Sequence, residues 1–359
     1  MFHALRFLLL PFAWLYGLVV MGRNLLFDVG VLRSRRFPLP VIAVGNLAVG
    51  GTGKTPHTEY LLRLLAGFRV AMLSRGYGRR SVGFAMAADS SRASDIGDEP
   101  AQIYRKFPEV VVAVDENRCE GIDILMRLHG KPIEAVVLDD AFQHRYVRAG
   151  KNILLTDYHR RFMHDWLMPV GRLREPASGK ARADIIIVTK CPEDLSADEA
   201  VTIRKEMALQ AGQRLFFTTF GYGRAYPLYP GEATVTAESV AGNEVLLITG
   251  IAKPGPLRQH LAQMAESVTE LAFPDHHNFT TIDLQRMSEA LVSLPQGAVT
   301  VTTEKDAERL KEMSGLDSRL RQRLLVQPVE VRFLFGQQEE FNQNILDYVA
   351  KDTRNSAVD

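Results

Sequence analysis

A glycine-rich octapeptide at residues 48–55 is the part of this sequence with the clearest chemical meaning. It reads Ala48-Val49-Gly50-Gly51-Thr52-Gly53-Lys54-Thr55. Glycines let a loop turn tightly, so that its N–H groups and the start of the following helix converge on a polyphosphate. In such a loop Lys54 reaches the β- and γ-phosphates and Thr55 binds Mg²⁺. The looser form of the motif accepts Ala48 in place of its first glycine, so the segment predicts a nucleotide site.

An acidic pair after an apolar run would supply a second Mg²⁺ anchor. The run 135–138 is typical of a buried strand, and Asp139 and Asp140 follow it directly. Ligands of parallel α/β sheets bind beyond the carboxyl ends of the strands, so both aspartates are expected beside the phosphates. A buried strand that runs into an Asx turn is the alternative interpretation.

The surrounding elements alternate between strands and helices. An apolar run at 41–44 precedes the phosphate loop, and leucines at 61–65 indicate the apolar face of a helix after it. Further strands are expected at 69–73, 110–114, 152–157, 184–190 and 214–220. The alternation predicts a doubly wound α/β sheet of the P-loop NTPase type.

A second, smaller α/β lobe is expected toward the C-terminus, and an apolar helix at the N-terminus. The predicted organisation is an N-terminal helix and basic segment at 1–36, a P-loop kinase domain at 37–220, a hinge or ribbon at 221–235 and a lid domain at 236–350. Two lobes that close on each other would exclude water from a reacting phosphate.

The N-terminus differs in kind from the rest of the chain. Residues 7–22 are almost wholly apolar and include Pro11, Trp14 and Tyr16, and arginines follow at 23, 33, 35 and 36. The stretch is short for a bilayer span. Aromatic residues in an apolar helix followed by arginines are typical of an interfacial anchor on anionic lipid. A core helix packed on the nucleotide domain is the alternative.

Composition narrows the class of protein. The 359 residues are 46% hydrophobic and carry a formal net charge of +1, which suits a globular chain of two domains and argues against general nucleic-acid binding. Cys119 and Cys191 have no histidine at ligand spacing, which indicates a reducing compartment and no structural zinc.

Three further polar clusters are candidates for catalysis. Asp98 and Glu99 precede a helix, where a carboxylate can meet a substrate hydroxyl or simply cap the helix. His276 lies in a polar turn of the second lobe and can orient or deprotonate a partner. Arg174 beside Glu175 is either a charge-stabilising arginine or a surface salt bridge.

In this combination and order, the chain resembles the tetraacyldisaccharide 4'-kinase family, the lipid A 4'-kinases of Gram-negative bacteria. The matching segments are GGTGKTP (50–56), SRGYGR (74–79), GDEP (97–100), LDDAFQHR (138–145), GRLREP (171–176), VTKCP (188–192), FPDHHNF (273–279) and TTEKDA (302–307). The resemblance covers most of the chain. It implies an ATP-dependent, Mg²⁺-requiring kinase that phosphorylates the 4'-hydroxyl of tetraacyldisaccharide 1-phosphate and forms lipid IVA.

The resemblance also implies individual roles. Lys54 would hold the phosphates, and Asp98 with His276 would deprotonate the sugar hydroxyl, while Arg174 is the candidate that neutralises charge on the γ-phosphate. The residues expected around the metal are Thr55, Asp139, Asp140 and Glu175. The implied location is the lipid surface at the cytoplasmic face of the bacterial inner membrane, with the chain peripheral or anchored by its N-terminus.

Two other functions use many of the same residues. A soluble kinase of a small metabolite needs the loop, the acidic pair and the lid, but not the apolar stretch 7–22. A nucleotide-dependent switch or partner-recruiting ATPase is suggested by residues 187–190, which loosely resemble the base-reading strand end of P-loop GTPases, although Pro192 stands where those proteins have aspartate. Phosphate transfer to an added lipid distinguishes these functions.

Overall fold

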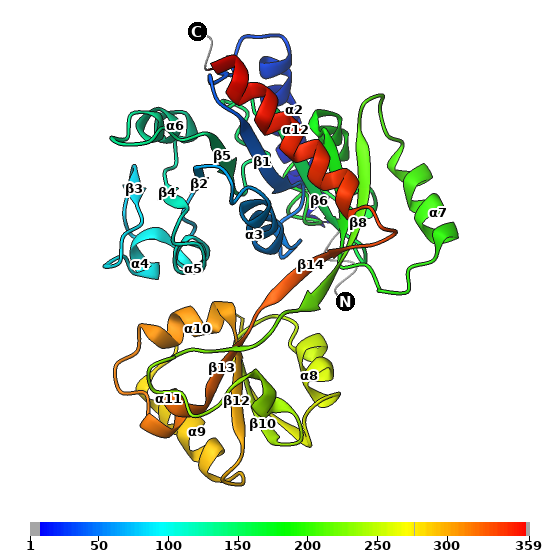
Figure 1. Cartoon of the computed structure of the whole chain (residues 1–359). Coiled ribbons are helices and arrows are strands. Elements are labelled where there is room, and N and C mark those ends of the chain that lie inside the picture. The colour runs from blue at the N-terminus through cyan, green and yellow to red at the C-terminus, as the bar shows by residue number, and fades with distance from the viewer. Residues whose placement is uncertain (1–7, 276, 357–359) are drawn as a thin grey trace. The chain divides into compact units, whose positions relative to one another are not determined.

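The computed structural model describes residues 8–275 and 277–356, and these form two compact units (Figure 1). Unit 1 comprises the described residues of Met1–Asp89, Ile103–Phe220 and Val331–Asp359, and unit 2 comprises those of Ser90–Gln102 and Gly221–Glu330. Each unit has its own sheet and its own hydrophobic clusters. Two of the crossings between the units lie within β8 and β14, which are neighbours in one sheet, and the other two lie at the ends of the segment 90–102.

Unit 1 is built on a mainly parallel sheet. Among the described residues its nine strands lie in the order β14 (Val329–Phe333), β8 (Arg214–Tyr222), β7 (Ile185–Thr189), β6 (Lys151–Asp157), β1 (Val41–Asn46), β5 (Ala135–Leu138), β2 (Val70–Ser74), β4 (Val111–Val114) and β3 (Ala85–Met86). Every residue of β1, β2, β5 and β7 is buried. Strands covered on both faces need continuous apolar runs, which is the pattern the sequence has there.

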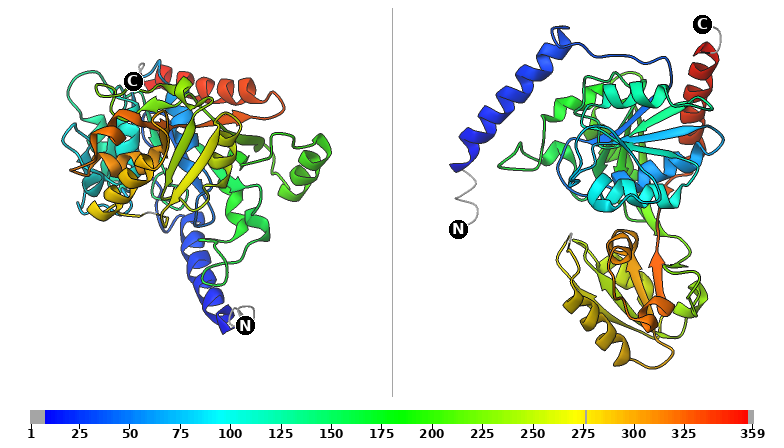
Figure 2. Two further views of the ribbon diagram at one scale, coloured as in Figure 1. Left: turned by 90° about the horizontal axis from the view of Figure 1, so that it is seen from below. Right: turned by 90° about the vertical axis from the view of Figure 1, so that its left-hand side faces the viewer.

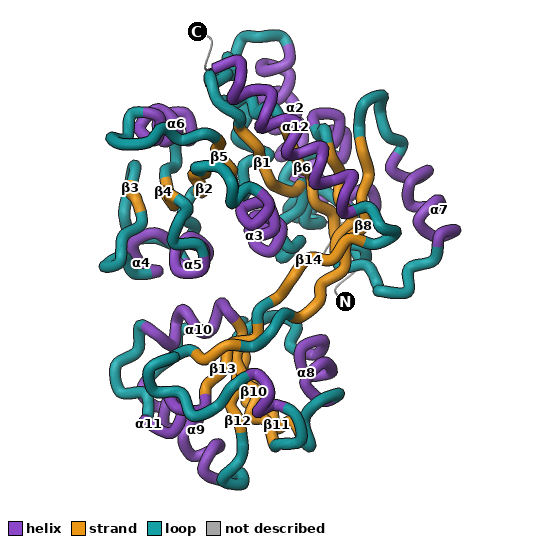
Figure 3. The backbone as a smooth tube through the Cα atoms, viewed as in Figure 1, coloured by secondary structure: helices purple, strands orange, loops and turns teal. Residues whose placement is uncertain are grey.

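Helices cover both faces of this sheet (Figures 1 and 3). On one face α3 (Lys54–Leu64) packs beside α12 (Gln338–Ser356), with the rings of Tyr60 and Phe341 5.9 Å apart. On the other face lie α6 (Arg118–Met126) and α7 (Ala197–Met207), whose apolar side chains join clusters with alternate strand residues. The predicted doubly wound α/β fold is therefore confirmed.

The apolar N-terminal helix is also confirmed. α2 (Leu10–Asp28) has Pro11 in its first turn, where proline does not interrupt the hydrogen bonding. Its N-terminal half extends past the rest of unit 1 (Figure 2). A core helix would be buried, whereas α2 leaves large apolar side chains in solvent: Phe12, Trp14, Leu15, Leu18, Val19, Met21, Leu25 and Leu26.

Unit 2 is a second, smaller α/β unit. Its sheet has the order β11 (Ser267–Ala272), β10 (Glu244–Thr249), β12 (Val299–Thr303), β13 (Leu324–Gln327) and β9 (Tyr226–Pro227), with only β9 antiparallel to its neighbour among these described strands. The helices of this unit include α4 (Ala93–Ile96), α8 (Gly255–Ala262), α9 (Thr281–Val292), α10 (Glu304–Lys311) and α11 (Ser318–Arg323). α5 (Asp98–Lys106) begins in unit 2 and ends in unit 1.

The compact units differ from the expected domain ranges in two places. The segment after residue 330 belongs to unit 1, because α12 packs Phe341 against Phe216 at 5.4 Å between ring centroids. Residues 90–102 belong to unit 2, because Ala93 donates its N–H to Glu312 at 2.6 Å and Asp98 pairs with an arginine of α10. No element was expected after residue 302, so α10, α11, β13, β14 and α12 were missed.

Gly45, near the end of β1, offers a test of this packing. A methyl group at this position would lie 2.6 Å from Cβ of Phe142, so Gly45→Ala should lower the free energy of unfolding of unit 1 by about 1–3 kcal/mol. Both tryptophans, Trp14 and Trp166, belong to unit 1, so urea unfolding followed by tryptophan fluorescence reports this change. Gly67→Ala adds a methyl group in open space and is the matched control. Equal midpoints for the two variants would contradict the packing argument.

Candidate phosphate-binding and catalytic site

The phosphate loop leaves the end of β1 and leads into α3. Gly50 and Gly53 have φ values of 114° and 88°, which residues with a Cβ rarely adopt. A Cβ on Gly53 would also lie 2.4 Å from Cζ of Phe220. α3 begins at Lys54, so the N–H groups of its first turn, which have no partner within the helix, face the loop. The backbone therefore has the form that a polyphosphate requires.

Side chains from the neighbouring strand ends hold this loop in place. Asn46 donates from Nδ2 to the hydroxyl of Thr52 at 2.8 Å, and the hydroxyl of Thr189 donates to the carbonyl of Thr52 at 2.8 Å. Lys190 donates to the carbonyl of Gly51 and forms an ion pair at the end of β6. The carbonyls that the turn leaves unpaired are thus bonded by β7.

His57 lies buried in α3, beneath the loop. Its Nδ1 is 2.7 Å from the carbonyl oxygen of Gly53, and its Nε2 is 3.1 Å from the hydroxyl of Thr218. Burial lowers the pKa of His57 to about 4, against a smaller opposite effect of the bond to Gly53. The ring is therefore neutral at physiological pH and joins the loop to β8. No motif marks this histidine in the sequence.

The predicted acidic pair lies beside α3. Asp139 is buried and accepts a hydrogen bond from the hydroxyl of Thr58 at 2.9 Å. Asp140 has a left-handed φ of 45° and is partly exposed. One of its oxygens is 3.6 Å from Nζ of Lys54, and both are 3.0 Å from a guanidinium nitrogen of Arg174. Two cations therefore share one carboxylate at the carboxyl end of β5.

Glu175 is already surrounded by protein donors. Its carboxylate is buried and accepts two hydrogen bonds from Arg182, at 2.8 and 2.9 Å. Gln143 donates to it at 2.8 Å and Asn24 at 3.2 Å. Each oxygen thus accepts two bonds, and this arrangement favours a structural role. The metal contact expected for Glu175 stays a prediction.

A buried arginine that sequence analysis did not single out lies in the field of the acidic pair. Arg118 begins α6 and donates to the carbonyl of Asp115 at 3.1 Å. Burial and the charge of Arg75 lower the pKa of Arg118 to about 10, whereas Asp139 and Asp140 raise it. The guanidinium stays charged at neutral pH, so it adds a fixed positive charge to this region. Only the burial, which the sequence does not reveal, distinguishes it from a surface arginine.

Polar bonds join α2 to the same region. The hydroxyl of Tyr16 donates to the carbonyl of Arg174 at 2.7 Å, and burial raises the pKa of this tyrosine. One turn before the end of the helix, Arg23 donates to the carbonyl of Gln143 at 3.2 Å. The helix therefore fixes the loop that carries Arg174.

In unit 2, Asp98 is held by an arginine of α10. Nη2 of Arg309 donates to Oδ2 of Asp98 at 3.1 Å. Nη1 of the same arginine donates to Oδ1 of the fully buried Asp306 at 3.2 Å. The carboxylate of Asp98 is therefore oriented by a side chain that is itself anchored. His276, the expected partner of Asp98, lies outside the described residues, and the next residue, His277, bonds to a carboxylate at the start of α9.

The chain matches one known family along nearly its whole length. A family model described as Tetraacyldisaccharide-1-P 4'-kinase matches residues 5–350. The chain is 50% identical over 356 residues to a tetraacyldisaccharide 4'-kinase of Bacteroides fragilis, with 98% of this chain and 95% of that protein covered. It is 49% identical over 352 residues to one of Phocaeicola vulgatus, with 97% and 96% covered.

A solved structure is similar in fold. It is the crystal structure of LpxK from Aquifex aeolicus, described as the apo form in complex with ATP. The TM-score is 0.73 and the sequence identity is 29%, and the match covers 96% of this chain and 99% of that one.

His57 makes the stability of unit 1 depend on pH. Its pKa is about 4 in the folded chain against the ordinary 6.5, so the unfolded chain binds the proton first as the pH falls. The resulting stabilisation, at most about 3 kcal/mol, is fully present above pH 6.5 and is lost as the pH falls toward 4. The free energy of unfolding, measured in urea at several pH values, should therefore fall less steeply between pH 7 and pH 5 for His57→Gln than for the unaltered chain. The exposed His129 provides the control, His129→Gln, and identical slopes for all three proteins would contradict the assignment.

Proposed function

The chain belongs to the tetraacyldisaccharide-1-P 4'-kinase family, and we propose that the residues around the phosphate loop, together with Asp98 and His276, carry out its reaction. It is an ATP-dependent kinase that transfers the γ-phosphate to the 4'-hydroxyl of tetraacyldisaccharide 1-phosphate and forms lipid IVA in lipid A biosynthesis. The observation that carries this conclusion is the family match over residues 5–350. The small-metabolite kinase and the nucleotide switch are set aside on the same ground.

The triphosphate of ATP is assigned to the phosphate loop. Supporting this, the loop has glycines where the backbone turns, and Thr189 and Lys190 bond its outward carbonyls. Lys54 holds the β- and γ-phosphates. The residues proposed to surround the phosphates are Ala48, Val49, Gly50, Gly51, Thr52, Gly53, Lys54 and Thr55.

Thr55, Asp139 and Asp140 are the residues proposed to hold Mg²⁺. Among the described side chains, no group of three or more His, Cys, Asp or Glu would hold a metal by itself. Mg²⁺ takes one or two carboxylates and completes its shell with water and phosphate oxygens, so a hydroxyl and an acidic pair fit this cation. The ion supplies charge neutralisation and fixes the geometry of the phosphates.

Arg174 is proposed to stabilise the charge of the transferring phosphoryl group. It shares Asp140 with Lys54, so two cations are held at one point beside the loop. Positive groups that are already in place where negative charge develops lower the barrier without reorganisation.

Asp98 is proposed as the base, with His276 as its partner. The proton of the 4'-hydroxyl passes to this pair while the sugar oxygen bonds to the γ-phosphorus and the bond to the bridging oxygen of ADP breaks. The proposal rests on the GDEP and FPDHHNF motifs and on the contact with Arg309, which orients the carboxylate.

The membrane surface is the proposed location, at the cytoplasmic face of the bacterial inner membrane. α2 is long and apolar enough to cross a membrane by length and composition, and 17% of its most apolar window is buried. Aromatic and aliphatic side chains exposed on this scale suit a lipid phase, where a tetraacylated substrate is also held. The anchor is either peripheral or a single N-terminal span.

Transfer of labelled γ-phosphate from ATP to tetraacyldisaccharide 1-phosphate in detergent tests the function. The unaltered protein should give labelled lipid, and Lys54→Ala should abolish it, because this lysine is the proposed side-chain cation that holds the β- and γ-phosphates. Lys131→Ala removes an exposed lysine and should keep full activity. ATP turnover without labelled lipid would refute the assignment.

Alanine at the proposed base pair tests the mechanism. Asp98→Ala and His276→Ala should each lower kcat by roughly 10²- to 10⁴-fold, as expected for loss of a general base, with little change in ATP affinity measured by calorimetry. Glu99→Gln alters the adjacent carboxylate, which pairs with Lys305, and serves as the control. Undiminished kcat in both alanine variants would remove the pair from the mechanism.

A further inference from the structure

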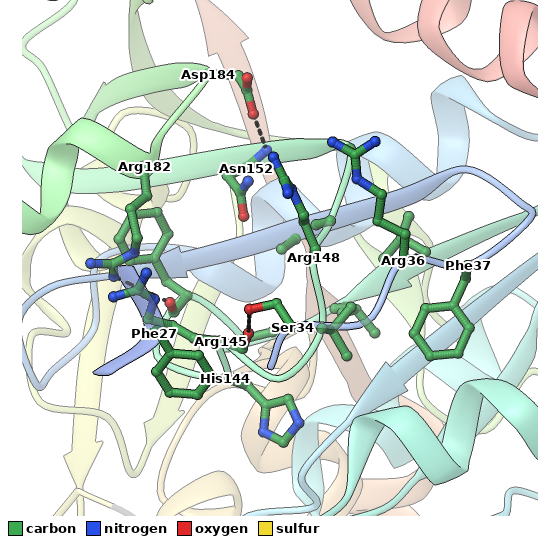
Figure 4. Close-up of a pocket in the computed structure, with 18 of the residues that line it drawn as sticks. Phe27, Ser34, Arg36, Phe37, His144, Arg145, Arg148, Asn152, Arg182 and Asp184 are labelled. Carbon is green, nitrogen blue, oxygen red and sulfur yellow. Dashed lines mark hydrogen bonds between the residues drawn. The ribbon is translucent and has the colours of Figure 1, made fainter. Parts of the chain in front are cut away.

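A cavity of about 860 Å³ opens in unit 1 beside the C-terminal end of α2 (Figure 4). One end of it lies where the parallel strands begin. Its lining there includes Val41, the first residue of β1, Asn152 near the start of β6, and Asp184 just before β7. The phosphate loop follows the opposite end of β1, and six strand residues span about 20 Å. This end of the cavity is therefore a separate place from the phosphate loop.

Backbone pairing brings two arginines together in this cavity. The N–H of Arg35 donates to the carbonyl of Tyr146 at 2.7 Å, and the N–H of Arg148 donates to the carbonyl of Arg35 at 2.8 Å. Arg36 and Arg148, here called the arginine pair, thus occupy adjacent positions on two parallel segments, and both line the cavity. Figure 4 shows their guanidinium groups extending in the same direction. The side chain of Arg35 is instead paired with Asp123.

The arginine pair has no acidic partner within the part of the chain that the structure describes. The other two arginines of the cavity do have one: Arg145 pairs with Asp28 at 2.6 Å, and Arg182 with Glu175 at 2.8 Å. Asp184, the remaining carboxylate of the lining, accepts a backbone N–H at 2.8 Å. Like charges at adjacent positions of paired segments repel each other. An anion bound between them would remove this repulsion.

The surroundings indicate what kind of anion fits. Planar guanidinium groups bind phosphate oxygens in pairs, which favours a phosphate group over a single-atom anion. Apolar side chains lie next to the arginine pair, with Phe37 and Leu39 in the lining and Val29 and Val31 exposed between α2 and Arg36. A phosphate that carries an apolar or glycerol portion would contact both kinds of surface.

We propose that the arginine pair binds a phosphate group of a ligand other than the reacting substrate. The ligand is a phosphate ester, and its source is either the headgroup of an anionic phospholipid or a soluble phosphorylated molecule. The site is independent of the kinase reaction, because it uses neither the phosphate loop nor the acidic pair.

Two probes test this site on the full chain. The first is sn-glycerol 3-phosphate, titrated by calorimetry into protein saturated with Mg-ADP so that the phosphate loop is filled. The second is flotation with phosphatidylcholine vesicles with and without phosphatidylglycerol. The double variant Arg36→Gln/Arg148→Gln is compared with Arg127→Gln/Arg258→Gln, which removes the same charge from exposed arginines outside the cavity and outside the N-terminal basic segment.

The double variant of the arginine pair should bind at least one probe roughly 25-fold more weakly, since each basic side chain near an anionic surface contributes about fivefold. The control variant should bind like the unaltered protein. A loss with vesicles alone identifies a lipid headgroup, and a loss with glycerol phosphate alone identifies a soluble phosphate. Unchanged binding of both probes, or equal losses in the control, would overturn the proposal.

Lys54→Ala separates this proposal from the kinase assignment. It should lose phosphate transfer to lipid and keep the binding of both probes. The double variant of the arginine pair, in turn, should phosphorylate substrate presented in detergent at the unaltered rate. Loss of probe binding in Lys54→Ala would mean that the probes occupy the phosphate loop, and the proposal would fail.

Discussion

The turn from β1 into α3 is the constraint on which the rest of unit 1 depends. A loop that points its N–H groups at a ligand must leave its own carbonyls facing outward, and these need donors in a buried setting. Thr189 and Lys190 supply these donors from the end of β7. Nδ1 of His57, in α3, contacts a further carbonyl of the loop, that of Gly53. β7 thus does more than extend the sheet, because the residues at its end fix the shape of the loop.

Charge is organised around the same turn. Lys54 and Arg174 have one shared carboxylate, Asp140, while Arg118 is held nearby by backbone carbonyls. Cations that are fixed beside the loop attract a highly charged triphosphate and offset part of the free-energy cost of removing its hydration. Asp139, bonded to Thr58, stays in a fixed orientation within this field.

The fold and the phosphate loop could be predicted from the sequence because their signals are local. Apolar runs, glycines and helix starts each lie within a few residues, whereas the features that were missed depend on residues far apart. The partners of Glu175 lie at positions 24, 143 and 182, and no motif connects them. α12, with its buried residues Phe341, Ile345 and Val349, was not predicted, and its packing in unit 1 joins it to strands that lie far away in the sequence. His57 and Arg118 are ordinary polar residues until burial is known.

The bonds of Tyr16 and Asn24 give α2 a role that a simple lipid tether does not have. Its contact face combines these polar bonds with buried small and apolar residues, and Gly17 has no room for a side chain, since a Cβ would lie 2.7 Å from Leu167. Replacing the helix with an unrelated apolar segment of equal length would release the backbone of Arg174. Substitutions that make α2 less apolar therefore belong on its exposed face, and the helix itself has to be kept.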